Sequence, residues 1–169
     1  RPRRAPAAHP WPPQRAVKRL NLDFSLSDDA ETGLETVYAS IPAVEVTGYL
    51  GTGHQLAHGY LAHTDHWHDP TFARLARARG DRPVAYLGSI TVSRHARGAG
   101  IGSEALEAFI SYVEARGAVA IFLYAAPTDR DGLDIYNLIE WYGRHGFQQV
   151  KSDRGFCIAM LRGRQRRRK

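Results

Sequence analysis

The sequence predicts a single domain of mixed α/β class, on the basis of the order of its apolar segments and of its length. Two apolar runs of strand length, Val84–Val92 and Val119–Tyr124, enclose a segment in which apolar residues recur at helical spacing. Strand, helix and strand in this order form a parallel βαβ unit with a right-handed crossover. The 169 residues are enough for one sizeable core but short for two.

The basic residues are concentrated at the two ends of the chain. Of the 23 lysines and arginines, six lie in residues 1–19 and six in residues 162–169. The remaining 11 basic residues and all 17 acidic residues lie in 20–161, which therefore has a formal charge of −6. Proline and arginine dominate 1–16, which predicts an extended basic arm, while 162–169 predicts a solvated basic tail. The folded domain is expected over 17–161. With no apolar run of membrane-spanning length and no secretory signal, we expect a cytoplasmic protein without a membrane partner.

Three strands are predicted in the first half of the chain. Apolar and polar residues alternate over 20–24, as in a half-buried strand. Two further strand-like segments, 36–45 and 54–63, are joined through a glycine-rich stretch. Pro42 falls inside the first of these two, so we expect it at an edge or an irregularity.

Capping residues mark the predicted helices. Asp69 and Pro70 are the residue types expected at an N-cap and a first helical position, and they predict a short helix. Gly117 is expected to end the helix of the βαβ unit. A last helix from Ile135 and a closing hairpin over 147–161 complete the domain.

Three glycines alternate where the first apolar strand turns into its helix. Without Cβ atoms, Gly98, Gly100 and Gly102 permit unusual dihedrals and the close approach of a ligand. The first N–H groups of a helix lack internal partners and lie at the positive end of its dipole, so they form an anion site, to which Arg97 adds charge. The spacing matches neither a P-loop nor a dinucleotide fingerprint. From this stretch alone, a turn that only packs helix on strand remains the alternative.

Two motifs together resemble the GNAT superfamily of N-acetyltransferases. Ile90–Val92 followed by Arg97–Ser103 is similar to the central acetyl-CoA motif of that family, and 141–147 is similar to its later helix, which ends in Tyr, three residues and Gly-Phe. The resemblance covers about residues 84–161. It implies a central mixed, mostly antiparallel sheet with flanking helices, in which the two strands of a parallel βαβ unit splay apart to admit acetyl-CoA. We expect Gly88 to help bend the first of these strands.

The resemblance also assigns residues to acetyl-CoA, the expected co-substrate. The strand before the glycine loop pairs with the pantetheine arm through its backbone, and the loop takes the pyrophosphate through its amides. No metal is expected, because the histidines clustered over 54–68 have no second ligand cluster to complete a site. The predicted cofactor-binding residues are Ile90, Thr91, Val92, Arg97, Gly98, Ala99, Gly100, Ile101, Gly102 and Ser103.

Acetyl transfer from a thioester to an amine requires a neutral amine near the carbonyl, a donor for the oxyanion and a proton for the departing thiolate. Tyr142 matches the tyrosine that the family uses as general acid, and a phenol with a pKa near 10 is protonated at neutral pH. The backbone N–H of Val92 is the candidate oxyanion donor. The general base is left open among Glu45, His95 and a water chain through Ser89.

The function predicted in this way is transfer of an acetyl group from acetyl-CoA to a primary amine, which is a small molecule, a lysine or a protein N-terminus. The acidic body favours a cationic acceptor. The alternative is a catalytically silent module of the same fold, attached to nucleic acid, an acidic partner or a large assembly through its basic ends. Whether the chain forms a homodimer is left open.

Overall fold

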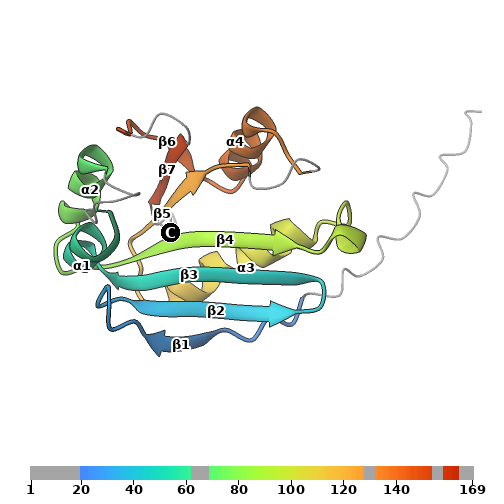
Figure 1. Ribbon diagram of the computed structural model, residues 1–169, viewed down its shortest axis with the longest axis horizontal. Coiled ribbons are helices and arrows are strands. Elements are labelled where there is room, and N and C mark those ends of the chain that lie inside the picture. Colours follow the sequence, from blue (N-terminus) through green and yellow to red (C-terminus); the bar gives the residue numbers. More distant parts are fainter. Residues whose placement is uncertain (1–19, 62–68, 128–131, 154–157, 164–169) are drawn as a thin grey trace, which may run out of the picture.

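One sheet organises the computed structural model, which describes residues 20–61, 69–127, 132–153 and 158–163. Across these residues seven strands lie in the order β1-β2-β3-β4-β5-β7-β6, and all neighbours are antiparallel except β4 and β5 (Figure 1). The predicted fold class, a mixed and mostly antiparallel sheet with one parallel βαβ unit, is therefore confirmed. The strands are β1 (Ser25–Asp28), β2 (Glu35–Ile41), β3 (Val44–Thr52), β4 (Pro83–Val92), β5 (Ala120–Ala125), β6 (Gln148–Gln149) and β7 (Ile158–Gly163).

Helices cover both faces of the sheet. Helices α3 and α4 contribute to one apolar cluster, whereas α1, the π-helical turn η1 and α2, which lie between β3 and β4 in the chain, contribute to the other. On β4, Leu87 belongs to the first cluster and Tyr86 to the second, so successive side chains are buried on opposite faces. No helix in the described part of the chain is long and apolar enough to cross a membrane. The helical elements are α1 (Gly53–Leu56), η1 (Ala57–Leu61), α2 (Pro70–Arg77), the 3-10 turn η2 (Arg94–Ala96), α3 (Ile101–Ala115) and α4 (Ile135–Arg144).

The predicted capping residues lie where the sequence indicates. Asp69 Oδ1 accepts a hydrogen bond from Phe72 N at 2.9 Å, and α2 begins at Pro70. Gly117 (φ +89°) and Gly146 (φ +88°) follow the ends of α3 and α4 in the left-handed conformation that terminates helices. Strands β6 and β7 pair as the predicted closing hairpin, part of whose turn lies outside the described residues.

The single strand predicted over 36–45 is instead two strands, β2 and the start of β3, and the strand predicted over 54–63 is wrong. A two-residue turn that contains Pro42 separates β2 from β3, and the second segment is helical, as α1 and η1, as far as the described residues reach. The helix starts because Thr52 Oγ accepts from Gln55 N at 3.1 Å while Gln55 Oε1 accepts from Thr52 N at 2.8 Å. This reciprocal capping box satisfies backbone donors that a strand would have left to a neighbouring chain segment.

The glycine-rich stretch predicted as a connection is the interior of β3. A Cβ at Gly48 would lie 2.6 Å from Tyr86 O and 2.7 Å from the Phe109 ring, and one at Gly51 would lie 2.5 Å from the Leu34 side chain. These glycines therefore serve the close approach of neighbouring elements, which is the meaning that glycine has inside a strand.

The segment over 20–24 is not the strand that its alternation predicts. It runs along α3, and β1 starts only at Ser25. The Phe24 ring lies 4.8 Å from that of Tyr112, and Leu20 N donates to Glu104 Oε2 at 3.2 Å. The alternation was thus a correct signal of burial, but the burying partner is a helix and not a sheet.

Asp69 joins three parts of the fold through one carboxylate, which is 0% exposed. The donors come from α2, from β5 and from the segment between β6 and β7, so the N-terminus of α2 is tied to both other elements. Its oxygens accept hydrogen bonds from Phe72 N (2.9 Å), Tyr124 Oη (2.8 Å), Asp153 N (3.2 Å) and Ser152 Oγ.

We expect Asp69→Ala to lower the free energy of unfolding by about 3 kcal/mol, because it leaves several buried donors without an acceptor. Urea denaturation followed by circular dichroism measures this change. Asp81→Ala, at an exposed turn, is the matched control and should shift stability by less than about 0.5 kcal/mol. Equal stabilities of the two variants would show that the Asp69 contacts do not hold the fold.

Candidate functional site

The parallel strands β4 and β5 part after three paired residues. Their register runs only from Ala85↔Ile121 to Leu87↔Leu123, although β4 continues to Val92. Beyond this point β5 pairs with β7 on its other side, and β4 pairs with β3. The splay that the resemblance implied is therefore present, and it opens toward the C-terminal end of β4.

A β-bulge lies at the start of the opening. Thr47 pairs with Ser89 and Gly48 with Leu87, so Gly88 is the extra residue on β4. A bulge bends its strand and increases the local twist. A Cβ at Gly88 would lie 3.1 Å from Thr47 O, which favours glycine at this crowded position. The bend that we expected at Gly88 coincides with the point where the two strands separate.

The peptide groups of Ile90 and Val92 face the open edge of β4. Ser93 N donates to Ala43 O at 2.9 Å, which makes these two residues a hydrogen-bonded pair at the end of the β3–β4 ladder. Because such pairs alternate with non-hydrogen-bonded pairs, the peptide groups of Val92 and Ile90 point away from β3, whereas that of Thr91 points toward it. Ile90 and Val92 are thus the residues of β4 that can pair with an extended ligand.

The glycine loop forms a concave cradle of backbone amides at the start of α3. Gly98 (φ +82°) and Gly100 (φ +77°) adopt left-handed conformations, and a Cβ at either would meet nothing within 4 Å. The first intrahelical hydrogen bond recorded in the described residues is from Glu104 N to Gly100 O, at 3.1 Å, so the preceding amides of the first turn have no such partner. Unpartnered amides at a helix N-terminus favour an anion such as a pyrophosphate.

Arg97 lies at the edge of this cradle. It is exposed, and its Nε donates to Val92 O at 3.3 Å, so the side chain folds back toward the end of β4. The guanidinium therefore brings positive charge to the place where the open strand edge and the cradle meet. Ile101 and Gly102, the first two residues of α3, are half-buried, and Ala99 is exposed in the loop.

Tyr142 is buried on α4, with 9% of its surface exposed. The rings of Trp141 and Phe147 lie 4.8 Å and 5.6 Å from its own, and it shares an apolar cluster with Val92 and Ile101. Burial raises the pKa of Tyr142 to about 12. Within the described part of the chain its hydroxyl has no hydrogen-bond partner.

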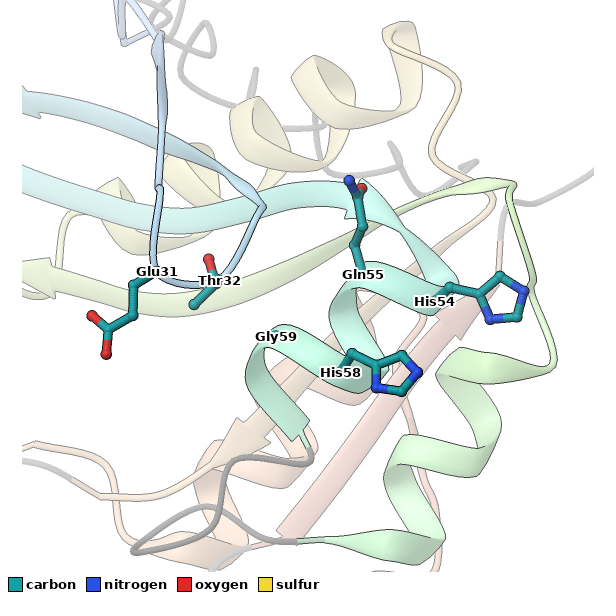
Figure 2. Close-up of a pocket in the computed structure, with 6 residues that line it drawn as sticks. All are labelled: Glu31, Thr32, His54, Gln55, His58 and Gly59. Atoms are coloured by element: carbon teal, nitrogen blue, oxygen red, sulfur yellow. The ribbon is translucent and has the colours of Figure 1, made fainter.

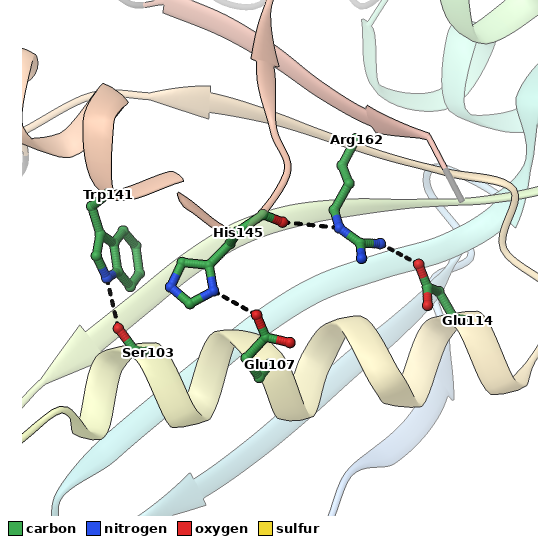
Figure 3. Close-up of polar contacts among 6 residues, drawn as sticks. All are labelled: Ser103, Glu107, Glu114, Trp141, His145 and Arg162. Carbon is green, nitrogen blue, oxygen red and sulfur yellow. Dashed lines mark hydrogen bonds and ion pairs between the residues drawn. The ribbon is translucent and has the colours of Figure 1, made fainter. Parts of the chain in front are cut away.

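Polar contacts that the sequence analysis missed tie α4 and β7 to α3 (Figure 3). Trp141 Nε1 donates to Ser103 Oγ at 2.8 Å, and His145 Nδ1 lies 2.6 Å from Glu107 Oε1. From β7, Arg162 pairs with Glu114 and also donates to His145 O. Trp141 and Ser103 both lie in the recognised motifs, but only the fold shows that they meet. Arg162, the first residue of the predicted basic tail, is part of β7.

The three candidates for the general base differ in how far they lie from the point where β4 and β5 separate. Ser89 is exposed on β4 immediately after the bulge. Glu45 is exposed on β3 opposite Thr91, and its Oε2 accepts from Tyr38 Oη at 3.1 Å. His95 lies in η2, beyond the end of β4. Ser89 is therefore the candidate that the fold places beside the point of separation.

A shallow cavity of about 390 Å³ lies between α1, η1 and the loop after β1 (Figure 2). Figure 2 shows that His54 and His58 extend from one side of the helix, whereas the Glu31 carboxylate points away from them. No group of three metal-ligating side chains occurs among the described residues. The other histidines of the 54–68 cluster lie outside them.

A parted parallel strand pair that leads to a glycine loop at a helix N-terminus, with a buried tyrosine nearby, is the arrangement that the resemblance to the GNAT superfamily implied. A sequence model described as the acetyltransferase (GNAT) family matches residues 30–148, which is more than half of the chain. The chain therefore belongs to the GNAT acetyltransferase family. This confirms the predicted class of enzyme, an acyltransferase, and acetyl-CoA as its co-substrate.

Solved structures with a similar fold share little sequence with this chain. The NatC complex bound to Gag peptide and CoA is 14% identical, over 78% of this chain and 71% of that chain, with a TM-score of 0.47. A histone acetyltransferase HPA2 and related acetyltransferase from Corynebacterium glutamicum is 21% identical (79% and 67%, TM-score 0.44). Arabidopsis thaliana NAA60 in complex with acetyl-CoA is 14% identical (76% and 73%, TM-score 0.45). A comparison with curated proteins gave no match.

We expect Gly100→Asp to weaken CoA binding by at least about 100-fold, because a carboxylate in the cradle repels the phosphates. Gly100→Ala imposes the same backbone strain without the charge, and it should weaken binding by less than about tenfold. Isothermal titration with CoA measures both. If the two variants bind equally, the phosphates do not lie at Gly100.

Proposed function

We propose that the protein transfers the acetyl group of acetyl-CoA to a primary amine at the parting of β4 and β5. The parting itself carries the proposal, because it is an unpaired strand edge that ends at an anion cradle. The pyrophosphate would lie against the amides of 98–103 with Arg97 beside it. The pantetheine arm and the thioester would lie along the open edge of β4, where the peptide groups of Ile90 and Val92 point away from β3.

In this proposal Tyr142 acts on the departing thiolate by donating a hydrogen bond. Its pKa of about 12 lies well above the value of about 8.5 that is usual for a thiol, so complete proton transfer from the phenol to the thiolate is uphill. A neutral phenol in an apolar surrounding is nevertheless a strong, fixed donor toward a developing anion. The Val92 N–H, on the same open edge, is the candidate donor to the oxyanion.

The acceptor amine is proposed to approach across the sheet face opposite α3. Val44 and Val46 of β3 pack in the cluster with α3, so the alternating residues Glu45 and Thr47 lie on the other face. Ser89 pairs with Thr47 and is exposed there. An exposed carboxylate on this face and the net negative charge of 20–161 favour a cationic amine, such as a polyamine, a lysine or a protein N-terminus.

The sheet face opposite α3 carries further negative charge near the part that α1, η1 and α2 cover. Burial and then the charges of Asp29 and Glu31 raise the pKa of Tyr49, which means that both carboxylates lie close to this tyrosine. Tyr49 on β3 pairs with Tyr86 on β4, only two residues before the bulge. Acidic residues on β3 and in the loop after β1 therefore border the proposed acceptor face, as steering of a cationic substrate requires.

A panel of amines with acetyl-CoA tests the proposed function, with thiol release as the readout. The panel contains spermidine, a lysine methyl ester, peptides with free N-termini and a neutral amine of similar size. We expect turnover with at least one cationic amine, and Glu45→Gln should raise the KM for that amine more than it lowers kcat. Saturable CoA binding without turnover of any amine would favour the silent module in place of an acetyltransferase.

We expect Tyr142→Phe to lower kcat by about 10- to 100-fold, because one hydrogen bond to a charged group is lost from the transition state. The affinity for CoA should change by less than about threefold. Steady-state kinetics and calorimetry on the same variant separate the two quantities. An unchanged kcat would remove Tyr142 from the mechanism.

The raised pKa of Tyr142 also predicts the alkaline limb of the pH profile. Desolvation favours the neutral phenol, so the proton remains bound until the pH approaches about 12. The rate should therefore rise as the amine loses its proton, and it should show no fall up to about pH 10. Loss of kcat in the wild type near pH 9, absent in Tyr142→Phe, would contradict a buried phenol.

A further inference from the structure

Trp141 stands one residue before Tyr142, but its polar contact is with the phosphate cradle. Its indole N–H donates to Ser103 Oγ at 2.8 Å (Figure 3). Ser103 is the third residue of α3, in the first turn, whose free amides form the cradle. We propose that Trp141 is a positioning residue for the phosphates of acetyl-CoA, because it holds Ser103 so that the hydroxyl proton is directed at the pyrophosphate. This inference rests on the proposed function.

The hydrogen-bonding capacity of the two groups gives the contact a direction. An indole N–H only donates, whereas a hydroxyl has one proton and two lone pairs. When the indole occupies a lone pair of Ser103, the hydroxyl proton is left for another acceptor. A serine in a helix can spend that proton on the carbonyl four residues earlier, which would be Ala99 O, but no such bond is recorded in the described residues. An accepted hydrogen bond also makes the hydroxyl a stronger donor.

The indole ring is held against the cradle from several sides. A Cβ at Gly102 would lie 3.7 Å from Trp141 Cζ2 and 3.4 Å from a methyl group of Val92, so the ring covers the first turn of α3 where it meets the end of β4. The rings of Tyr142 and His145 lie 4.8 Å and 5.4 Å from the indole. With these neighbours the N–H has little freedom to turn away from Ser103.

A second contact fixes the register of the two helices. His145 Nδ1 lies 2.6 Å from Glu107 Oε1, one turn further along both α4 and α3. Two ties one turn apart prevent α4 from sliding along α3. Because Tyr142 is on the same helical turn as Trp141, the phosphate donor Ser103 and the buried phenol are set by one pair of helices. Binding of the phosphates and placement of the phenol are therefore geometrically linked.

One substitution distinguishes a role of Trp141 in packing alone from a role in positioning Ser103. Trp141→Phe keeps an aromatic ring at this position of α4 but deletes the N–H donor together with part of the indole. If Trp141 positions Ser103, the variant should raise the Kd for CoA about five- to tenfold, the range expected for one lost hydrogen bond in a binding site. Ser103→Ala should have a similar effect, and the double variant should bind no more weakly than either single one.

Isothermal titration of CoA with the wild type, both single variants and the double variant tests this proposal. Ser103→Thr keeps a hydroxyl, so it should bind CoA like the wild type and should lose affinity when Trp141→Phe is added. Tyr136→Phe is the matched control, because this tyrosine is 80% exposed on the same helix, and it should leave the Kd unchanged. Thermal melting of each variant shows whether it is folded.

Two results would overturn the proposal. One is an unchanged Kd in folded Trp141→Phe, and the other is a loss from Trp141→Phe that is as large in the Ser103→Ala background as in the wild type. The second result would mean that the indole acts by itself, through packing. Failure of the wild type to bind CoA at all is a different outcome, which would overturn the proposed function and this inference with it.

Discussion

The separation of β4 from β5 is the constraint on which the rest of the site depends. The bulge at Gly88 bends β4, while β5 keeps its pairing with β7 on the other side, so the two strands cannot stay in register beyond Leu87. A strand edge with unpaired peptide groups is a liability in most proteins. Here the edge leads to the start of α3, where further donors have no partners. An extended ligand with an anionic end satisfies both sets of groups.

The two halves of the sheet are joined across the opening by side-chain contacts. On one face, Asp69 connects α2 to Tyr124 of β5 and to the segment before β7. On the other face, Arg162 of β7 pairs with Glu114 of α3, whose apolar side packs against β3 and β4. The elements on either side of the opening are therefore connected through side-chain contacts on both faces of the sheet, although the strands themselves are not paired.

The second half of the fold was predictable because its signals are local and strong. Residues 84–87 and 120–123 are buried on both faces, which produces continuous apolar runs, and the glycines of the cradle mark left-handed dihedrals. The first half gave weaker signals. All four residues of β1 are exposed, so no alternation marks it. The glycine at position 48 has a packing role that a single sequence does not distinguish from a turn.

The candidate site was predictable where a continuous segment carries a motif. The cradle and the strand before it are continuous in sequence, so the motif identified them together. The contact between Trp141 and Ser103 joins residues 38 positions apart, and neither side chain has a periodicity that indicates the other. The bulge, likewise, is a relation between two strands, for which Gly88 alone was only a suggestion. Pairwise geometry of this kind follows from the fold and not from local pattern.

Hydrogen exchange of the backbone amides, with and without CoA, tests most directly whether the parting of β4 and β5 is the acetyl-CoA site. If the parting is the site, exchange in the bound state should be slower at Ile90, Val92 and the amides of 98–103, because the ligand then accepts or covers these donors. Exchange in β1 and β2, far from the opening, should stay the same. Protection confined to other segments, with 88–92 and 98–103 unchanged, would contradict the account.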